Sequence, residues 1–346
     1  MENPFIITGK IKPEYFCDRQ QEAERIISKV TNGENLVLMA ARRIGKSKLI
    51  DFCLDKPAIK DHFIGISIDI LRTSSINEFT FELGKAVFEQ AARRGTKMLK
   101  MVVNTLKTIN GCFGYDPISN TPTFSLSLGD ISNPIYTLEE IFSCLEKADK
   151  KCIVAIDEFQ QIGYYPEKNM EAILRTYIQQ CNNANFIFSG SERHLISKMF
   201  SEKAHPFYNS ADMMYLEVIP LDKYTEFCER LFHKFGKDIS KEAIAKVYEI
   251  FEGNTYYMQK TVHEAFNQTD VANEANVEMM ENIIQSMVLD NDHKFSELLS
   301  RLTLPQKELL YAIAKDGIAK QLTSTAFIKK HNLRSASSIQ SALKKL

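Results

Sequence analysis

The sequence lacks the features that mark membrane, secreted or zinc-binding proteins. No apolar run approaches the roughly 20 residues that cross a bilayer, and the first ten residues, MENPFIITGK, have neither the basic flank nor the long apolar stretch of a signal peptide. The seven cysteines are scattered and never form a CxxC pair, so neither a disulfide framework nor a zinc site is indicated. We therefore expect a cytoplasmic protein with reduced thiols and no membrane partner.

The chain as a whole also has almost no net charge. Its 43 basic and 44 acidic residues leave a formal charge of -1, so no global field points to nucleic acid. The charges are unevenly placed, however. From Arg301 to Leu346 nine Lys and Arg residues oppose two acidic ones, a balance of +7, whereas the preceding 300 residues carry -8. Any signal for a polyanionic partner is therefore local to this C-terminal segment.

Five short apolar runs predict the strands of a parallel sheet. They are rich in β-branched residues and alternate with helix-like segments, which is typical of an α/β domain with helices on both faces of the sheet. We expect this domain to span residues 1–220. The runs are NLVLMAA at 35–41, FIGISIDI at 63–70, CIVAIDEF at 152–159, NFIFSGS at 185–191 and MMYLEVIP at 213–220.

The rest of the chain divides by pattern. Between the second and third runs, turn residues and the alternating stretch TFSLSLGD predict an inserted β-hairpin at about 96–134. From Leu221 the apolar residues recur at i, i+3 and i+4, which predicts a small helical lid at 221–270. We expect a helical connector at 271–302 and a separate all-helical module at 303–346.

The stretch MAARRIGKSKL carries the main functional signal. Residues 40–47 match the phosphate-binding pattern [GA]xxxxGK[ST], after a strand and before a helix. Backbone N–H groups of such a loop and of the first helical turn converge on a phosphate. Lys46 is expected to reach the β and γ phosphates and the Ser47 hydroxyl to bind Mg²⁺. The nucleotide-binding residues of this segment are Ala40, Ala41, Arg42, Arg43, Ile44, Gly45, Lys46, Ser47 and Lys48.

A second signal is a strand that ends in two carboxylates, Asp157 and Glu158. Residues at the carboxyl end of a parallel strand face the ligand crevice, so Asp157 is expected to hold Mg²⁺, directly or through water, near Ser47. Glu158 is then placed to orient and deprotonate an attacking water. A pair of acids at a strand end is also common as a merely solvated feature, but here it accompanies a phosphate loop in the same chain.

Polar residues after the strand run NFIFSGS are further candidates for the catalytic site. Ser189 and Ser191 are placed to touch the γ phosphate or the water, although a helix cap ahead of ERHLISKMF explains them equally well. Arg193 is a candidate for stabilising charge in the transition state. The alternative is an ordinary solvated arginine on a helix.

These motifs together resemble the archaeal-type and bacterial P-loop ATPases of the AAA+/STAND group. The resemblance includes a Phe-x-x-Arg-x-x-Glu box at Phe16, Arg19 and Glu22, the loop ARRIGKS, the strand end IDEF and the segment SGSERHLISKMF. In this family the box and a lid motif resembling Gly-Asn-Pro enclose the adenine. The lid motif is represented here by Gly253 and Asn254, with Thr255 in place of the proline.

The resemblance implies a P-loop NTPase fold of the ASCE type, in which an additional strand separates the two motif strands. It implies ATP rather than GTP, since no Asn-Lys-x-Asp guanine-reading box occurs. In such proteins hydrolysis is slow and changes conformation. The family also implies a C-terminal winged-helix module.

Residues 303–346 read as a helix-turn-helix. Pro305 lies in the expected first turn, and Thr323 and Ser335 are expected N-caps. The expected small core consists of Leu310, Ile313, Phe327, Leu333, Ile339 and Leu343.

Two partners suit this module. If it binds double-stranded DNA, the last helix would place Ser337, Ser338, Gln340 and Ser341 near base edges, with Arg334, Lys344 and Lys345 near phosphates. Alternatively it packs on the ATPase core or on another protein.

The leading hypothesis is a Mg²⁺-dependent ATPase that acts as a conformational switch. A non-hydrolysing, ATP-binding scaffold is the first alternative. A DNA-binding regulator with a vestigial ATP site is the second. A small-molecule kinase is less favoured, because the sequence indicates no second substrate pocket.

Overall fold

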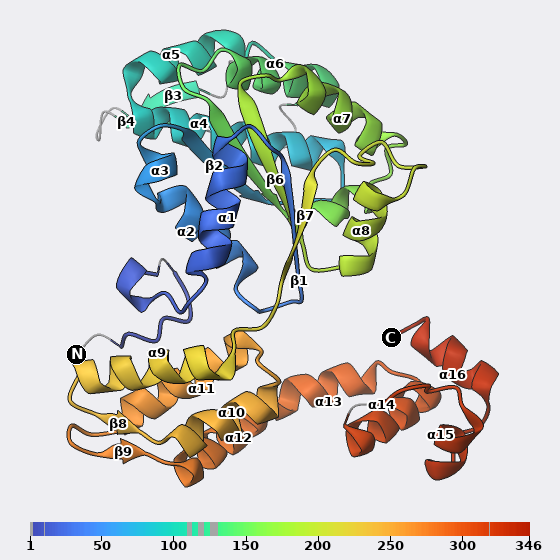
Figure 1. The fold of residues 1–346 in the computed structure, drawn as a ribbon. Coiled ribbons are helices and arrows are strands. Elements are labelled where there is room, and N and C mark those ends of the chain that lie inside the picture. The colour runs from blue at the N-terminus through green and yellow to red at the C-terminus, as the bar shows by residue number, and fades with distance from the viewer. Residues whose placement is uncertain (1–2, 10, 109–112, 117–120, 125–130, 318) are drawn as a thin grey trace. The chain divides into compact units, whose positions relative to one another are not determined.

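The computed structural model describes residues 3–9, 11–108, 113–116, 121–124, 131–317 and 319–346 (Figure 1). The chain divides into two compact units, Met1–Val277 and Glu278–Leu346. None of the described helices combines the length and the hydropathy that a membrane span requires.

The first unit is built on a five-stranded parallel sheet. Its strands are β1 (Leu36–Ala40), β2 (Ile64–Asp69), β5 (Cys152–Asp157), β6 (Ala184–Gly190) and β7 (Asp212–Leu216), in the order β2-β5-β6-β1-β7. Every residue of β1, β5 and β6 is buried, whereas the edge strand β2 buries alternate residues and the edge strand β7 exposes Asp212 and Tyr215. Because β6 lies between β1 and β5, the additional strand between the two motif strands is confirmed.

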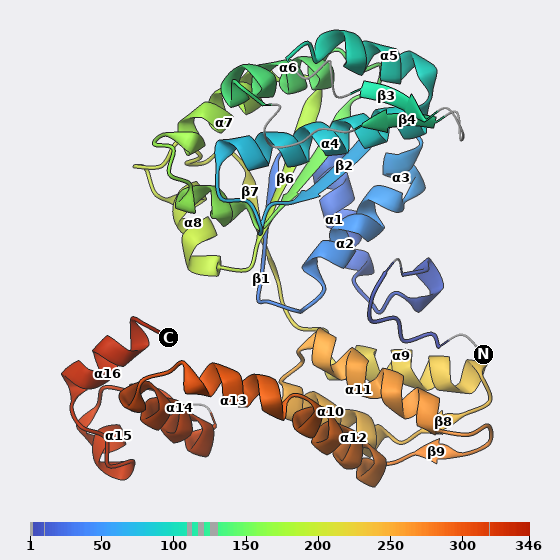
Figure 2. The ribbon, with the colours of Figure 1, turned by 180° about the vertical axis from the view of Figure 1, so that it is seen from behind.

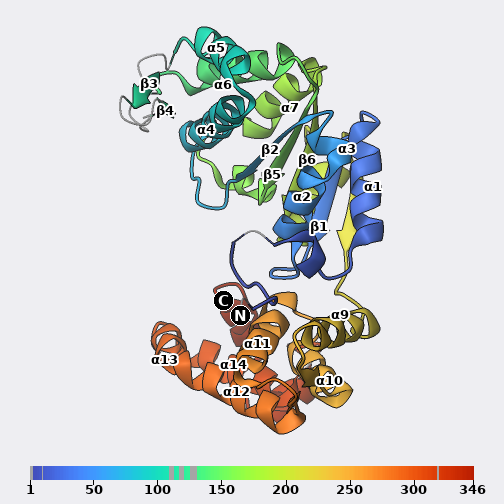
Figure 3. The same ribbon diagram turned by 90° about the vertical axis from the view of Figure 1, so that its left-hand side faces the viewer.

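Helices cover both faces of the sheet (Figure 3). On one face lie α1 (Gln20–Thr31), α2 (Lys46–Asp55) and α3 (Pro57–Lys60), and on the other α4 (Ile76–Arg94), α6 (Pro134–Glu146), α7 (Met170–Gln180) and α8 (Arg193–Ser201). Strand β1 shows why both faces are needed. Its Leu36 and Leu38 belong to the core under α1 and α2, while Val37 and Met39 belong to the core under α4 and α6.

The described part of the first unit also contains two 3₁₀ helices and one further α-helix. They are the 3₁₀ helix Pro13–Tyr15, the 3₁₀ helix Phe159–Tyr164, which follows β5 directly, and α5 (Thr96–Thr105). The capping of α4 and α6 follows local sequence: Ser75 accepts a hydrogen bond from the Glu78 N–H, and Asn133 from the Tyr136 N–H.

The inserted region at 96–134 is more than the expected hairpin. It begins with α5, whose Met98, Leu99 and Val102 are buried in the core. An antiparallel pair follows, β3 (Phe113–Asp116) with β4 (Thr121–Phe124), and Figure 2 shows it beside α4. Of the stretch TFSLSLGD at 123–130, residues 125–130 lie outside the described residues.

The lid consists of α9 (Leu221–Lys234), α10 (Lys241–Phe251) and α11 (Thr255–Gln268). Two short strands, β8 (Asp238–Ile239) and β9 (Glu274–Ala275), pair in parallel and tie the following residues to these helices. The boundary between the two units falls between Val277 and Glu278, inside the segment 271–302 that was expected to be a helical connector.

The second unit holds the C-terminal helices. α12 (Val277–Asp290) crosses the boundary and is followed by α13 (Asp292–Ser300), α14 (Leu304–Asp316), α15 (Thr325–Lys330) and α16 (Ala336–Leu343). Pro305 lies in the first turn of α14, as expected.

Several details of this unit differ from the sequence-based expectation. Ser324, not Thr323, caps α15, because its hydroxyl accepts the Phe327 N–H, whereas Ser335 caps α16 as predicted. Leu309 and Ala342 are buried where Leu310 and Leu343 were expected, and Leu343 is exposed. A shift of one residue on a helix turns a side chain by about 100°, so the helix pattern predicted the core face and missed its register.

Candidate active site

The phosphate loop, residues 40–47, joins the buried strand β1 to the helix α2. Gly45 adopts φ +88° and Arg43 φ +66°, both in the left-handed region, which glycine tolerates best. No side chain caps the N-terminus of α2, so the N–H groups of its first turn stay available to an anion. Local sequence thus forms a turn that presents backbone donors beyond the carboxyl end of β1.

Lys46 is the first residue of α2, and only 6% of its surface is exposed. Its Nζ lies 2.7 Å from Asp157 Oδ1 and 2.9 Å from Glu158 Oε1. The loop lysine and the carboxylate pair, Asp157 and Glu158, are therefore brought together from two separate segments of the chain. Two negative charges face one positive charge, so these three side chains together carry a net charge of -1.

Two serine hydroxyls converge on Asp157. Ser47 Oγ donates to Asp157 Oδ2, and Ser189 Oγ donates to Asp157 Oδ1 at 2.7 Å. Ser189 is buried on β6, the strand between the two motif strands. Its hydroxyl therefore orients a carboxylate, and the helix-cap explanation of Ser189 is not supported.

Glu158 makes a second set of contacts. Its Oε2 accepts hydrogen bonds from Gln160 Nε2 at 2.7 Å, from Ser191 Oγ at 2.8 Å and from the Ser191 N–H at 3.1 Å. The Ser191 hydroxyl also accepts from Arg42 Nε at 3.3 Å. Ser191 thus links the phosphate loop to the carboxylate pair.

The pKa values of both carboxylates lie below their usual range. Burial by itself would raise the pKa of Asp157, but the Lys46 ammonium and the hydroxyls of Ser189 and Ser47 outweigh it. Burial also acts to raise the pKa of Glu158, and the hydrogen bond from Gln160 and the Lys46 charge lower it. Both acids are therefore ionised at neutral pH.

The second arginine of the loop, Arg43, faces the lid. Its guanidinium lies 5.2 Å and 5.1 Å from the ring centres of Tyr256 and Tyr257, and it donates to the Tyr257 hydroxyl. Its carbonyl oxygen accepts a hydrogen bond at 3.0 Å from the Tyr256 N–H, in the first turn of α11. The phosphate loop therefore supplies a cap for a lid helix that has no side-chain cap of its own.

The residues of the N-terminal box, Phe16, Arg19 and Glu22, contact other residues of the chain. Arg19 is buried and pairs with Glu22 Oε1 at 2.7 Å, while it also donates to the Glu217 carbonyl beyond the end of β7. Phe16 stacks on Phe52 of α2, with ring centres 4.2 Å apart. These two residues fix the chain before α1 against α2 and β7, and a role at the adenine stays a prediction.

Gly253 and Asn254 lie at the start of α11. Gly253 has φ +74°, and a Cβ there would lie 2.8 Å from Val218 Cβ, so only glycine fits. The Asn254 Oδ1 and Thr255 Oγ1 atoms are buried without a hydrogen-bond partner among the described residues. Such atoms leave hydrogen-bonding capacity that a bound molecule could use.

The remaining predicted residues lie away from the carboxylate pair. Arg193 begins α8 and is exposed, and its side chain forms no ion pair with the described residues. Lys48 pairs instead with Asp51 of its own helix at 3.6 Å. Ala41 is exposed, and Ile44 is buried in the core under α1 and α2.

Three features of this region were missed from the sequence. Gln160 reaches Glu158 from the 3₁₀ helix after β5, and its place two residues after the acid was the available signal. Asp69, at the end of β2, lies opposite Asp157 in the sheet register. Burial and, to a smaller extent, the charges of Asp157 and Glu158 raise the pKa of Asp69, although a hydrogen bond from the Leu71 N–H opposes this. The Arg43 contact with the lid had no sequence signal.

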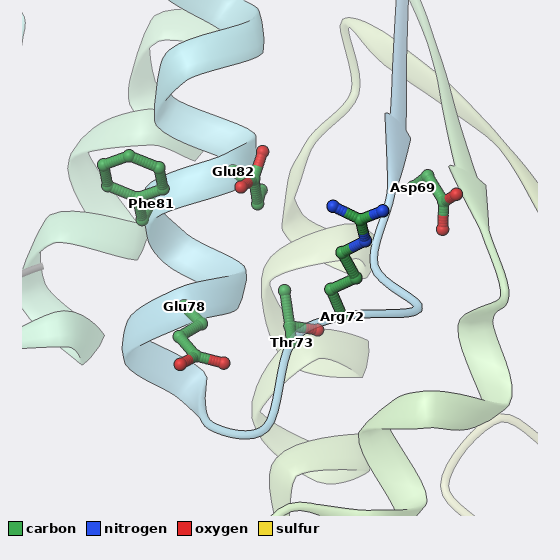
Figure 4. Close-up of a pocket in the computed structure, with 6 residues that line it drawn as sticks. All are labelled: Asp69, Arg72, Thr73, Glu78, Phe81 and Glu82. Atoms are coloured by element: carbon green, nitrogen blue, oxygen red, sulfur yellow. The ribbon is translucent and has the colours of Figure 1, made fainter.

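A cavity of about 400 Å³ lies beside the end of β2 (Figure 4). Glu78, Phe81 and Glu82 line it from α4, with Arg72 and Thr73 on the preceding loop and Asp69 at the strand end. Three carboxylates and one arginine line this space, which therefore repels phosphate. We assign no nucleotide to it.

The residues present suit a magnesium ion. The Ser47 hydroxyl and the Asp157 carboxylate are hard oxygen donors in direct contact. No group of three or more His, Cys, Asp or Glu side chains with metal-binding geometry occurs in the described part of the chain. Mg²⁺ usually takes one or two protein ligands and completes its shell with water and substrate phosphates, so the Ser47 hydroxyl and the Asp157 carboxylate are enough to hold it.

Two family models match the chain. One, described as an ATPase domain predominantly from Archaea, matches residues 16–261, and the other, a probable winged helix domain, matches residues 293–346. The second match begins ten residues before the expected module and so includes α13 except its first residue. A search of curated proteins gives no significant match.

Several solved structures have the same fold, and their alignments cover almost the whole of this chain. The Walker-type ATPase paby2304 of Pyrococcus abyssi has a TM-score of 0.65 at 20% identity, covering 99% of this chain and 92% of that one. The Aeropyrum pernix ORC2 protein, in ADPNP-ADP complexes, has a TM-score of 0.58 at 13% identity, covering 99% and 88%. The Aeropyrum pernix ORC1 protein, in complex with DNA, has 0.55 at 10%, covering 99% and 86%. At these identities the likeness shows the fold alone.

The ion pair predicts a pH dependence of stability. In the wild type the folded-state pKa values of Asp157 and Glu158 are lowered, so their contribution to the free energy of unfolding is present above about pH 4 and is lost as the pH falls below it. Lys46→Met leaves both buried acids without their cation and should cost about 3–5 kcal/mol at pH 7. Without the Lys46 charge only hydrogen bonds oppose the effect of burial, so the pKa of both acids rises and the stability gap between the variant and the wild type should narrow from pH 7 to pH 5.

Thermal unfolding at several pH values, without nucleotide or divalent cations, measures this difference. Lys48→Met is the matched control, because its partner is half-exposed and the pair contributes little. A gap between Lys46→Met and the wild type that stays constant from pH 7 to pH 5 would contradict the account.

Proposed function

The chain belongs to the family of ATPase domains found predominantly in Archaea, and on this premise we propose that it binds Mg·ATP and hydrolyses it slowly as a conformational switch. One observation carries the proposal: Lys46 Nζ, at the start of α2, lies within 2.9 Å of both Asp157 and Glu158. The three groups that phosphoryl transfer to water needs are a phosphate-binding cation, a metal ligand and a base.

ATP binding would exchange the partners of Lys46. The β and γ phosphates carry more negative charge than the carboxylate pair and are met by the N–H groups of α2. The Lys46 ammonium would turn to these phosphates, which removes the cation from Asp157 and Glu158. When bound, Mg²⁺ would neutralise phosphate charge, with Ser47 and Asp157 as its protein ligands.

Hydrolysis then needs one proton acceptor. Water attacks the γ phosphorus, a new P–O bond forms, and the bond to the β-phosphate oxygen breaks to give ADP and inorganic phosphate. The proton of the water passes to Glu158, whose Oε1 is the oxygen that Lys46 vacates. Lys46 stabilises the charge on the transferred group. Once Lys46 has turned away, the pKa of Glu158 loses one of the contacts that lowered it, which makes the carboxylate a better proton acceptor.

The switch is supported by the contact between the phosphate loop and the lid. The Arg43 carbonyl caps α11 through Tyr256, and the Arg43 side chain lies against Tyr256 and Tyr257. A phosphate that orders the loop would change this contact and so shift the lid. ATP is favoured over GTP because the sequence has no guanine-reading box.

Phosphate release tests the assignment of the base. Glu158→Gln keeps the size of the side chain and removes its basicity, so the rate should fall about 100-fold or more while ATP still binds. Lys46→Ala should weaken ATP binding itself. Glu202→Gln, an exposed acid after α8, should match the wild type.

The same measurement separates the alternatives. Equal, near-zero rates for the wild type and Glu158→Gln would contradict the hydrolysis proposal and favour an ATP-binding scaffold. Transfer of phosphate to a small molecule with no release to water would favour a kinase.

Double-stranded DNA is the partner we propose for the second unit. Its residues 293–346 match a winged helix domain, and the Aeropyrum pernix ORC1 structure is a complex with DNA. The residues Arg334, Lys344 and Lys345 are exposed at the two ends of α16, and Ser337, Gln340 and Ser341 are exposed along it. Three cations around an exposed polar helix suit contact with a phosphate backbone.

Anisotropy titrations of a labelled duplex test this partner. The variant Lys344→Ala/Lys345→Ala should bind more weakly. The plot of log K against log salt concentration should become shallower by about 2 in slope, because two phosphate contacts are lost. Lys203→Ala, at an exposed position of the first unit, should not change the slope. Salt dependence equal to the wild type would contradict DNA contact by α16, and DNA affinity indifferent to ATP and to Lys46→Ala would favour a vestigial ATP site.

A further inference from the structure

The two carboxylate oxygens of Glu158 have different surroundings. Oε1 faces the Lys46 ammonium at 2.9 Å. Oε2 accepts three hydrogen bonds, from Gln160 Nε2, from Ser191 Oγ and from the Ser191 N–H. None of these three donors belongs to the phosphate loop, so all three remain when Lys46 turns to a phosphate. One oxygen is anchored and the other faces the reaction.

Gln160 is the most deeply buried of these partners, with 1% of its surface exposed. An ionised carboxylate only accepts hydrogen bonds, so the Gln160 amide must present Nε2 to Glu158. Its Oε1 is then left buried without a hydrogen-bond partner in the described part of the chain. A buried acceptor without a hydrogen-bond partner destabilises a fold. Gln160 Nε2 thus keeps its hydrogen bond to Glu158 although Oε1 of the same amide has no partner among the described residues.

Gly190 provides the space that this arrangement needs. A Cβ on Gly190 would lie 2.1 Å from Gln160 Oε1 and 3.1 Å from Ile196 Cδ1. The first distance is far inside van der Waals contact, so any side chain at 190 displaces the Gln160 amide. Gly190 is the last residue of β6 and directly precedes Ser191, the second anchor of Glu158.

We infer that Gln160 is a positioning residue for the catalytic base, and that Gly190 is small so that Gln160 can reach it. Gln160 holds Oε2 of Glu158, which directs Oε1 to the place where water attacks once Lys46 has turned to the γ phosphate. The inference rests on the proposed hydrolysis and adds to it a residue that does not touch ATP.

Steady-state hydrolysis by the full chain tests the role of Gln160. Gln160→Leu keeps the approximate volume and removes the donor, so kcat should fall about tenfold or more, as expected for a hydrogen bond to a charged group. KM for ATP should stay within about twofold, because Lys46 and the loop are untouched. Gln161→Leu is the matched control, since the Gln161 amide donates to the Thr73 carbonyl at 2.9 Å and not to Glu158.

Gly190→Ala displaces Gln160 without removing a polar group. It should lower kcat in the wild-type background and have little further effect in Gln160→Leu, because it acts through Gln160. Gly163→Ala, in the same 3₁₀ helix as Gln160, is the control, because a Cβ there meets nothing within 4 Å. If the losses of kcat caused by Gly190→Ala and Gln160→Leu add up in the double variant, the inference is overturned. A rise in kcat for Gln160→Leu would also overturn it, because Gln160 would then hold the base back from the reaction.

A readout without nucleotide separates positioning from a general loss of structure. The side-chain amide NMR signals of Gln160, identified by their absence in Gln160→Leu, should move in Glu158→Gln and in Gly190→Ala but not in Gly163→Ala. Signals indifferent to Glu158→Gln would overturn the inference. A wild type that releases no phosphate overturns the proposed function and this inference together, whereas an active wild type that Gln160→Leu leaves unchanged overturns only the inference.

Discussion

The ion pair between Lys46 and the carboxylates of Asp157 and Glu158 is the interaction on which the rest of the site depends. It joins the start of α2 to the end of β5 in a place where 6% of the lysine is exposed, so neither partner can be left without the other at low cost. A phosphate competes for the same ammonium. The contact that stabilises the empty site is therefore also the one that nucleotide binding must exchange.

Strand order explains why these groups meet. Strand β6 lies between β1 and β5, so the ends of three neighbouring parallel strands carry the phosphate loop, the serines and the carboxylate pair. Ser189 orients Asp157 from this middle strand, and Ser191 anchors Glu158 just beyond it. The same loop reaches the lid through Arg43, which gives the site a mechanical connection to α11. The winged-helix unit adds a separate set of exposed cations, Arg334, Lys344 and Lys345, at the two ends of α16.

The sequence predicted the parts of this site that depend on local pattern. Gly45, Lys46 and Ser47 follow from a loop motif between a strand and a helix, and Asp157 and Glu158 follow from the end of an apolar strand. Gln160 was missed because its role depends on space left by Gly190 on another strand, and Asp69 because its place opposite Asp157 depends on sheet register. In the second unit the helices were predicted, but the shifts from Thr323 to Ser324 and from Leu343 to Ala342 are set by packing that periodicity does not resolve.

The central claim is that a triphosphate replaces the carboxylate pair as the partner of Lys46. Thermal unfolding of the full chain titrated with Mg·ATP, Mg·GTP and metal-free ATP measures it most directly. At about 100 times its dissociation constant, Mg·ATP should raise the free energy of unfolding by about 2.7 kcal/mol. At the same concentration Mg·GTP should raise it less, because guanine does not make the contacts expected for adenine. Metal-free ATP should also raise it less, because Ser47 and Asp157 then have no metal ion to bind. No rise with Mg·ATP would contradict the account.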